Sequence, residues 1–380
     1  MLSRMIDSSN YFSLSVRVAI CFLVGLASAA QAQLPSGHID DVFSFLKSAN
    51  APGAAVLVIR DGKPVFRQGY GVTDLRSLHP INPDTNFRLA SFTKQFTATC
   101  IMLLVHDGKL RYDEHLSDIF PEFPAYGRAI TVRNLLNHTS GLPDYEDILM
   151  KQYPDTPPEK IPQILDAGVL KLLEQQSSGK FPPGSKWEYS NSGYATLAMI
   201  VEKISGKPFG QFLHDRIFAP LQMSNTLAYE KGKNEVSNRA YGHTKDGETF
   251  KETDQSPTSA VLGDGGIYTS IDDLTKWDQA IRNHTLLSEA EMQPALTPVH
   301  VANELPTSEG HNVSYGFGWF IDPYRGHRRM WHDGETIGFR TTIQRFPEDK
   351  LTIIILANRT DIDPEKLALK VADLYLGGKR

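Results

Sequence analysis

Three short patterns, far apart along the chain, bring together residue types that can perform nucleophilic chemistry. Ser91 and Lys94 form the first pattern, Tyr189 and Asn191 form the second in the middle of the chain, and residues 332–334 (His-Asp-Gly) form the third near its end. Each pattern alone is a weak signal, because short combinations of common residues arise by chance. Their order and their complementary chemistry make a function predictable.

Ser91 and Lys94 are three positions apart, which on a helix places both side chains on one face, with about 5–6 Å between Cβ atoms. A serine hydroxyl is a poor nucleophile until a neighbouring group takes its proton. A lysine in a partly desolvated cleft can have a lowered pKa and assist in that transfer. A serine at a helix start also offers its own free backbone N–H to a developing oxyanion. The simpler alternative is that Ser91 only caps the helix.

Tyr189 and Asn191 are a candidate second pair. A phenol near a lysine ammonium is expected to ionise more easily, so Tyr189 could act as general base toward Ser91 and later protonate the leaving group. The Asn191 amide has two donors and an acceptor, enough to hold Lys94 and a substrate amide. The alternative is a polar turn that caps a helix beginning near Tyr194.

The third pattern follows a strand-like segment. We expect His332 to face a cleft, as a cation or hydrogen-bond donor for a substrate carboxylate, or as a group that assists proton transfer. Gly334 beside a strand would let a substrate backbone approach closely. The backbone N–H of Glu335 could then be a second oxyanion donor. The alternative is a polar hairpin end with a surface histidine.

The elements that must position these residues come from both ends of the chain. The fold class that they predict is α/β (α+β), with an antiparallel sheet built from both chain ends, flanked by helices, and an inserted helical lobe; the cleft between the lobes would hold the site. The sheet lobe is expected at about 39–108 and 255–380 and the helical lobe at about 109–254. The predicted strands are 54–60, 64–70, 327–332, 338–346 and 351–357, and the main predicted helices are 39–46, 91–106, 196–204, 209–218, 271–281 and 364–376.

Composition predicts a soluble globular protein with no nucleic-acid partner. The chain has 380 residues, 41% of them hydrophobic, and a mild net charge of −5 without a basic run. Arg4 and Arg17 precede an apolar run over 18–30 that ends in Ala-Gln-Ala32, which predicts a signal peptide at 1–32, cleaved after Ala32, and a periplasmic or secreted protein. The run is too short to span a bilayer, although a retained anchor stays open. Residues 33–380 are expected to form a single catalytic domain.

Cysteine and histidine usage argues against other hydrolase mechanisms. Cleavage would remove Cys21 and leave Cys100 alone, in an apolar run that predicts a buried packing thiol. The chain has neither a His-Glu-x-x-His pattern nor a Gly-x-Ser-x-Gly elbow, so neither a metal site nor an α/β-hydrolase is expected. No metal or cofactor is predicted.

Ser-x-x-Lys, Tyr-x-Asn and a terminal strand motif ending in Gly, in this order, resemble the serine beta-lactamase and penicillin-binding-protein superfamily. The match is closest to the class C beta-lactamase-like branch, with its D-Ala-D-Ala carboxypeptidases, D-aminopeptidases and family VIII esterases. The segments 135–143, 263–270 and 315–319 resemble landmarks of that branch, and the likeness covers about 40–378.

The resemblance implies a beta-lactamase/transpeptidase-like fold and a role for each matching residue. Ser91 would be the acylated nucleophile and Lys94 its activating partner, while Tyr189 would be the general base and acid. Asn191 would position Lys94 and substrate. The N–H groups of Ser91 and Glu335 would form the oxyanion hole.

One departure from the family pattern affects the expected substrate. Efficient beta-lactamases of this branch usually have Lys-Thr-Gly where this chain has His332, Asp333 and Gly334. Histidine is only partly protonated near neutral pH, and Asp333 would add negative charge if it faced the cleft.

We therefore expect an exported serine hydrolase acting through an acyl-enzyme on a small-molecule or peptidoglycan-peptide-like substrate. D-peptidase or carboxypeptidase-like chemistry and esterase chemistry rank equally, and beta-lactamase ranks third. A cell-wall-binding, penicillin-recognising module without turnover is the other alternative, and the oligomeric state is left open.

Overall fold

The computed structural model describes residues 36–301, 305–306 and 312–377 of the chain. Residues Pro35–Arg380 form one compact unit. The predicted signal peptide, residues 1–32, lies outside the described residues. No helix within the described ranges combines the length and the apolar character needed to cross a bilayer.

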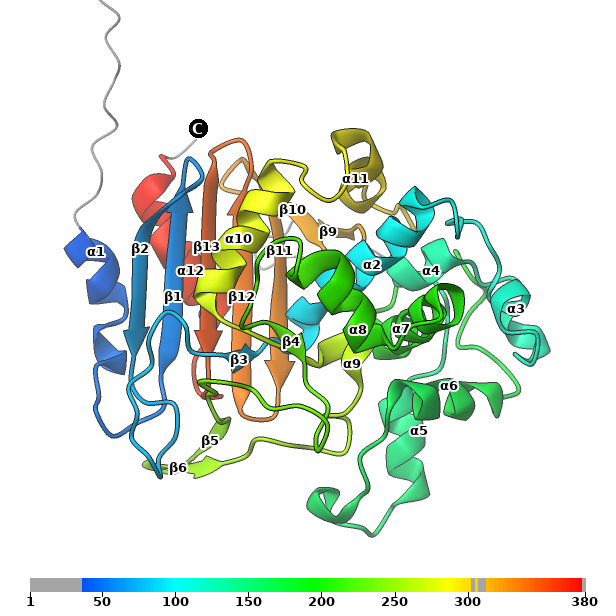
Figure 1. Cartoon of the computed structure of the whole chain (residues 1–380), viewed down its shortest axis with the longest axis horizontal. Helices are drawn as coiled ribbons and strands as arrows, with labels where there is room; N and C mark the ends of the chain where they lie inside the picture. Colours follow the sequence, from blue (N-terminus) through cyan, green and yellow to red (C-terminus); the bar gives the residue numbers. More distant parts are fainter. Residues whose placement is uncertain (1–35, 302–304, 307–311, 378–380) are drawn as a thin grey trace, which may run out of the picture. The chain divides into compact units, whose positions relative to one another are not determined.

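An eight-stranded antiparallel sheet forms the centre of this unit, and both ends of the chain contribute to it (Figure 1). The strand order is β2-β1-β13-β12-β11-β10-β9-β8, so a strand from the start of the chain pairs with one near its end. This topology confirms the predicted fold class. The strands are β1 (Ala54–Arg60), β2 (Lys63–Tyr70), β8 (Leu305–Pro306), β9 (Asn312–Tyr315), β10 (Phe320–Tyr324), β11 (His327–Thr336), β12 (Phe339–Phe346) and β13 (Leu351–Ala357).

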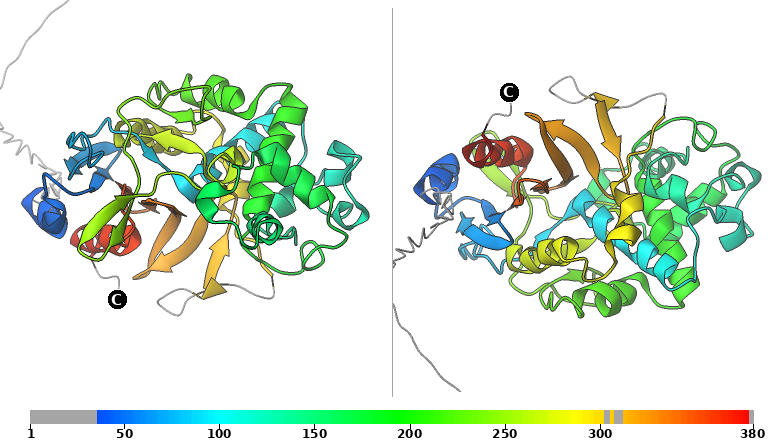
Figure 2. Two further views of the ribbon diagram at one scale, coloured as in Figure 1. Left: turned by 90° about the horizontal axis from the view of Figure 1, so that it is seen from below. Right: turned by 90° about the horizontal axis from the view of Figure 1, so that it is seen from above.

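The neighbouring strands β1 and β13 separate two hydrophobic cores. Both are continuous apolar runs, and successive side chains of a strand point to opposite faces. Val56 and Ile355 pack in a core with α12 (Pro364–Tyr375), whereas Leu57 and Ile354 pack in the core that contains the helical lobe. Figures 1 and 2 show α12 behind the sheet with α1 (Ser36–Val42) beside it, and α10 (Ile271–Arg282) on the opposite face.

The helical lobe and the smaller sheets lie on the side of the sheet that carries the nucleophile segment. Its longest helix begins at Asn191, earlier than the predicted residue 196, because the Ser190 side chain accepts the Gly193 N–H and caps the helix. The predicted helix 209–218 is a short α-helix followed by a π turn, His214–Phe218. The helices are α2 (Lys94–His106), α3 (Leu116–Ile119), α4 (Val132–Leu136), α5 (Tyr145–Gln152), α6 (Asp166–Glu174), α7 (Asn191–Ser205), α8 (Phe209–Leu213), α9 (Leu262–Gly265) and α11 (Glu289–Leu296). The short strands are β3 (Phe87–Arg88), β4 (Leu227–Ala228) and β7 (Ile267–Thr269) in one sheet and β5 (His243–Asp246) and β6 (Thr249–Glu252) in another.

The C-terminal third contains more strand than the sequence predicted. Strands β8, β9 and β10 extend the sheet beyond the three predicted strands, and β11 continues four residues further than expected, through Thr336. These segments are short, and two of them contain a proline, so their strand conformation depends on pairing with neighbours. As a result, residues 332–336 are held in a regular ladder with β12.

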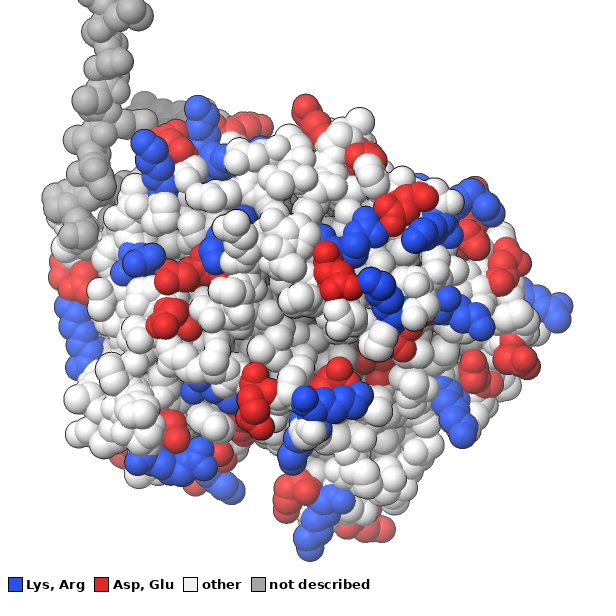
Figure 3. All heavy atoms as spheres, viewed as in Figure 1, with Lys and Arg blue, Asp and Glu red and all other residues white. Residues whose placement is uncertain are grey.

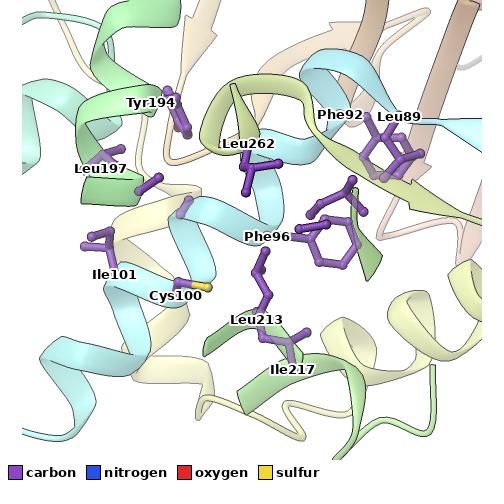
Figure 4. Packing of buried hydrophobic residues seen from close by; sticks show 14 of the residues in the cluster. Leu89, Phe92, Phe96, Cys100, Ile101, Tyr194, Leu197, Leu213, Ile217 and Leu262 are labelled. Carbon is purple, nitrogen blue, oxygen red and sulfur yellow. The ribbon is translucent and has the colours of Figure 1, made fainter. Parts of the chain in front are cut away.

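A shared core fixes the sheet lobe against the helical lobe. Figure 4 shows Phe96 and Cys100 of α2 and Tyr194 and Leu197 of α7, which belong to one buried hydrophobic cluster. Cys100 is fully buried and has no disulfide, as predicted. This packing holds α2 against α7. It therefore fixes the position of Lys94, at the start of α2, relative to Asn191, at the start of α7.

Charged side chains of both signs are interspersed on the face seen in Figure 3. Among the described residues many form close pairs, such as Arg216 with Asp107 at 2.6 Å. Pairs of this kind cancel charge locally, so this face presents a mixed potential, in keeping with the mild net charge of the chain.

Candidate active site

Ser91 lies in a 3₁₀ turn, Ala90–Thr93, which leads directly into α2. The predicted helix is present, but its first turn is tighter than an α-helix. Ala90 has φ of +50°, a left-handed conformation that costs energy in a residue other than glycine and persists only where the surroundings enforce it. On the N-terminal side of this turn, the Leu89 N–H donates to Ile267 O and its carbonyl accepts from Thr341 Oγ1. The Ser91 side chain is partly exposed, so its hydroxyl faces solvent from a fixed turn.

Lys94 is fully buried beneath Ser91, and its three N–H groups each have an acceptor. Nζ lies 3.1 Å from Ser91 Oγ, 2.8 Å from Asn191 Oδ1 and 3.0 Å from the Asp264 backbone oxygen. The amide and carbonyl oxygens can only accept, so the bond to Ser91 alone can reverse. Burial lowers the pKa of Lys94 to about 8, against the opposing effect of the Asp264 and Glu146 carboxylates. When Lys94 is neutral, its lone pair therefore faces the Ser91 hydroxyl.

Tyr189 contacts both members of this pair. Its ring centroid lies 4.8 Å from Lys94 Nζ, and its hydroxyl interacts with the Ser91 side chain. Burial raises the pKa of Tyr189 well above its usual value, so the expectation of an easily ionised phenol was wrong. The resting side chain is neutral, and it can pass a proton only by receiving one as it gives one.

Asn191 is the first residue of α7, and its amide bridges two charged groups. Oδ1 accepts from Lys94, and Nδ2 donates to Glu146 Oε1 at 3.2 Å. Glu146, on α5, is partly exposed, and its pKa is raised by burial and by the neighbouring carboxylates of Asp264 and Asp144. Sequence reasoning missed Glu146, because no spacing rule links residues 146 and 191.

His332 does not offer a cation to a substrate. Its Nδ1 lies 2.7 Å from the Asp333 backbone oxygen, which can only accept, so Nδ1 has the proton and Nε2 accepts from the Tyr315 hydroxyl at 3.0 Å. The ring is 1% exposed, and burial together with the nearby Lys94 charge lowers the pKa of His332 to about 3. This differs from the expected carboxylate-binding cation, because strand β11 and the surrounding aromatic rings exclude water from the imidazole.

Asp333 and Gly334 also differ from expectation. Asp333 points to the opposite sheet face, where it accepts a hydrogen bond from Thr342 and interacts with Glu365 of α12. Its charge is therefore not placed in the cleft. A Cβ on Gly334 would lie 2.0 Å from Leu89 O, so the nucleophile segment fills the space that we had expected for a substrate backbone.

A small polar cleft opens beside Ser91. It brings Ser91, Asn191 and Glu335 together from three distant segments, while Lys94 and Tyr189 reach Ser91 from its floor and side. No role was predicted for the 263–270 segment, whose Asp264 and Gly265 form part of the cleft wall. The lining residues are Arg88, Ala90, Ser91, Tyr145, Glu146, Asn191, Thr258, Asp264, Gly265, Glu335 and Thr336.

The chain is similar in sequence and fold to known proteins. The Beta-lactamase family model matches residues 39–376. Penicillin-binding protein 4* of Bacillus subtilis (strain 168) is 32% identical over 356 residues, which cover 90% of this chain and 76% of that protein. A D-aminopeptidase of Brucella canis is 27% identical over 337 residues, covering 88% and 62%. The crystal structure of a penicillin binding protein from Bacillus halodurans superposes with a TM-score of 0.74 at 25% identity, covering 89% of this chain and 99% of that one.

Proposed function

The chain belongs to the beta-lactamase family, and on that premise we propose that it is an exported serine hydrolase that cleaves amide or ester bonds through an acyl-enzyme at Ser91. One observation carries the proposal: the only reversible hydrogen bond of the buried Lys94 amine is the one to the partly exposed Ser91 hydroxyl. That arrangement suits deprotonation of a nucleophile. Export rests on the N-terminal sequence alone.

Acylation would begin with proton transfer from Ser91 to neutral Lys94. Ser91 Oγ then bonds to the substrate carbonyl carbon, and the backbone N–H groups of Ser91 and Glu335 stabilise the oxyanion. Tyr189 gives its proton to the departing nitrogen or oxygen and recovers one from Lys94, so no charged phenolate accumulates. In deacylation, water adds its hydroxyl to the same carbon, the Ser91 ester bond breaks, and Ser91 regains a proton.

The charges around the cleft favour substrates without a carboxylate beside the scissile bond. His332 is neutral, and Glu146 contributes a partly exposed carboxyl group to the cleft, whereas the buried Arg88 guanidinium in the lining donates to the Gly265 and Ser259 carbonyls. A D-aminoacyl amide or peptide and a neutral ester therefore suit the site better than a C-terminal carboxylate or an anionic lactam. The D-aminopeptidase relative supports the first of these classes. Beta-lactamase activity is the weaker alternative.

A substrate panel tests this preference. We expect kcat/KM for p-nitrophenyl acetate and D-alanine p-nitroanilide to exceed that for nitrocefin and a D-Ala-D-Ala peptide by roughly 10²-fold, because desolvated like charges cost a few kcal/mol. Glu146→Gln keeps an acceptor for Asn191 but removes the charge, so it should reduce the difference in kcat/KM between the two groups of substrates. Dominant hydrolysis of nitrocefin or the D-Ala-D-Ala peptide by the wild type would contradict the preference.

The pH dependence of ester hydrolysis should follow Lys94. Only the neutral amine accepts the Ser91 proton, and below the pKa the neutral fraction falls about tenfold per pH unit. We therefore expect kcat/KM for a neutral ester to rise with pH and to level off above about 8, the lowered pKa of this buried amine. The rate measured with Ser91→Ala gives the hydroxide background. A flat profile from pH 6 to 9 would assign proton removal to another group.

A further inference from the structure

The short helix α9 binds three side chains of residues 88–97, the segment that contains the nucleophile, through its backbone carbonyls. Asp264 O accepts from Lys94 Nζ at 3.0 Å, Gly265 O accepts from Arg88 Nε at 3.1 Å, and Gly263 O accepts from Thr97 Oγ1 at 2.6 Å. The position of α9 therefore fixes the direction of one of the three Lys94 N–H groups. A shift of α9 would directly change the hydrogen bond between Lys94 and the Asp264 carbonyl.

Asp166, which belongs to the helical lobe, holds helix α9 in place. It is the first residue of α6, it is 7% exposed, and its two carboxylate oxygens accept the N–H groups of Leu262 at 2.8 Å and Gly263 at 2.9 Å. Helix α9 has four residues, so these N–H groups have no acceptor within the helix itself. A second tie comes from Tyr145, whose hydroxyl donates to Asp264 Oδ2 at 2.8 Å.

Space around the contact leaves little freedom. A Cβ on Gly263 would lie 2.4 Å from Tyr194 O and 3.1 Å from Asp166 Oδ1, so the segment is pressed between α7 and the carboxylate. The segment therefore has little room to shift toward α7 or toward Asp166.

Placing a carboxylate here is costly. Burial raises the pKa of Asp166 to about 7, and the two backbone N–H groups only partly offset that effect. No Lys or Arg of the described residues forms an ion pair with it. A serine or threonine at this point would cap a helix with no buried charge. Because burying a carboxylate costs free energy, its presence here suggests that both backbone N–H groups require a strong acceptor.

We propose that Asp166 is a positioning residue for the reaction: by binding the two N-terminal N–H groups of α9, it places the Asp264 carbonyl against Lys94. The proposal rests on the proposed function of Ser91 and Lys94. Asp166 lies behind the segment and has no place in the cleft lining. Its effect reaches the reacting atoms through the backbone of residues 262–264.

Asp166→Asn tests this role with little change in size. The amide has one acceptor oxygen, so one backbone N–H loses its partner and the Asp264 carbonyl loses its fixed place. The ammonium form of Lys94 is then less stabilised. We expect kcat for a neutral ester to fall about tenfold or more with KM nearly unchanged, and the inflection of the pH profile to move down by about half a unit or more.

The matched control is Asp363→Asn, which alters the carboxylate cap of α12, where Asp363 Oδ1 accepts the Lys366 N–H at 3.0 Å, far from Ser91 in the fold. It should lower the melting temperature but leave kcat and the pH profile unchanged. Thr97→Val is a second variant that removes another tie to the same segment, and it should cause a smaller change of the same kind.

The outcomes separate this proposal from the function that it depends on. Wild-type enzyme without turnover or Ser91 labelling would refute the function itself. If the wild type turns over, but Asp166→Asn and Thr97→Val, assayed well below their melting temperatures, both keep wild-type kcat and pH profile, the positioning role is wrong and Asp166 serves stability alone.

Discussion

Ser91→Ala is expected to abolish covalent labelling by a fluorescent acylating probe and to lower kcat/KM for a neutral ester by roughly 10⁴-fold or more. The alanine keeps the 3₁₀ turn but removes the atom that would bond to the acyl carbon. It also removes the only partner of Lys94 that can give up a proton. Labelling is measured on the intact protein by mass, and turnover is measured by release of p-nitrophenol.

The control for this variant is Ser77→Ala, at an exposed serine in a turn that is not part of the cleft lining. It should label and turn over like the wild type. Equal labelling of wild type and Ser91→Ala would end the acyl-enzyme proposal. Rapid labelling of the wild type without subsequent hydrolysis of ester, peptide or cephalosporin would instead identify a penicillin-recognising module that does not turn over.

Tyr189→Phe is expected to slow hydrolysis of an unactivated amide by about 10²–10⁴-fold. The phenylalanine keeps the ring beside Lys94 but lacks the hydroxyl that interacts with the Ser91 side chain. An amide nitrogen must be protonated as it leaves, whereas p-nitrophenolate leaves without a proton. The loss should therefore be much larger for a D-alanyl amide than for a p-nitrophenyl ester, and comparing kcat/KM for the two substrates measures the difference.

Tyr194→Phe is a close control for this variant. The Tyr194 ring also lies near Lys94, at 5.5 Å from Nζ, but its hydroxyl donates to the Leu136 carbonyl, away from Ser91. This variant should lose some stability and keep the ratio of amide to ester rates. A Tyr189→Phe enzyme with near-normal amide hydrolysis would transfer the proton-relay role to Lys94 or to water.

His332 and Asp333 occupy the positions where the family pattern usually has Lys and Thr. Their effect on the charge of the cleft differs from the one predicted from the sequence. The sequence predicted a partly protonated histidine and an added negative charge. The fold makes the imidazole a neutral, fixed acceptor for Tyr315 and turns the aspartate toward α12. The third motif, residues 332–334, therefore contributes no charged side chain to the cleft. For this reason we expect a preference for neutral or cationic acyl groups.

The sequence by itself determined the features that depend on local geometry and on apolar patterning. The strands at 54–60 and 351–357 are recognisable because each is a continuous apolar run, and the two strands pair in the sheet. Ser91 and Lys94 come together because three residues make one turn of a helix. The family was predictable for the same reason, since its motifs are short local patterns in a fixed order.

Only the tertiary structure decided which groups are charged and what they bind. The pKa values of Lys94, Tyr189 and His332 depend on burial by segments that lie far away in the chain, and no local pattern encodes that burial. The same holds for Asp166, whose role arises because residues 166 and 262 meet across the core. Hydrogen-bond partners and desolvation are properties of the packed chain, so they became visible only when its separate segments were placed together.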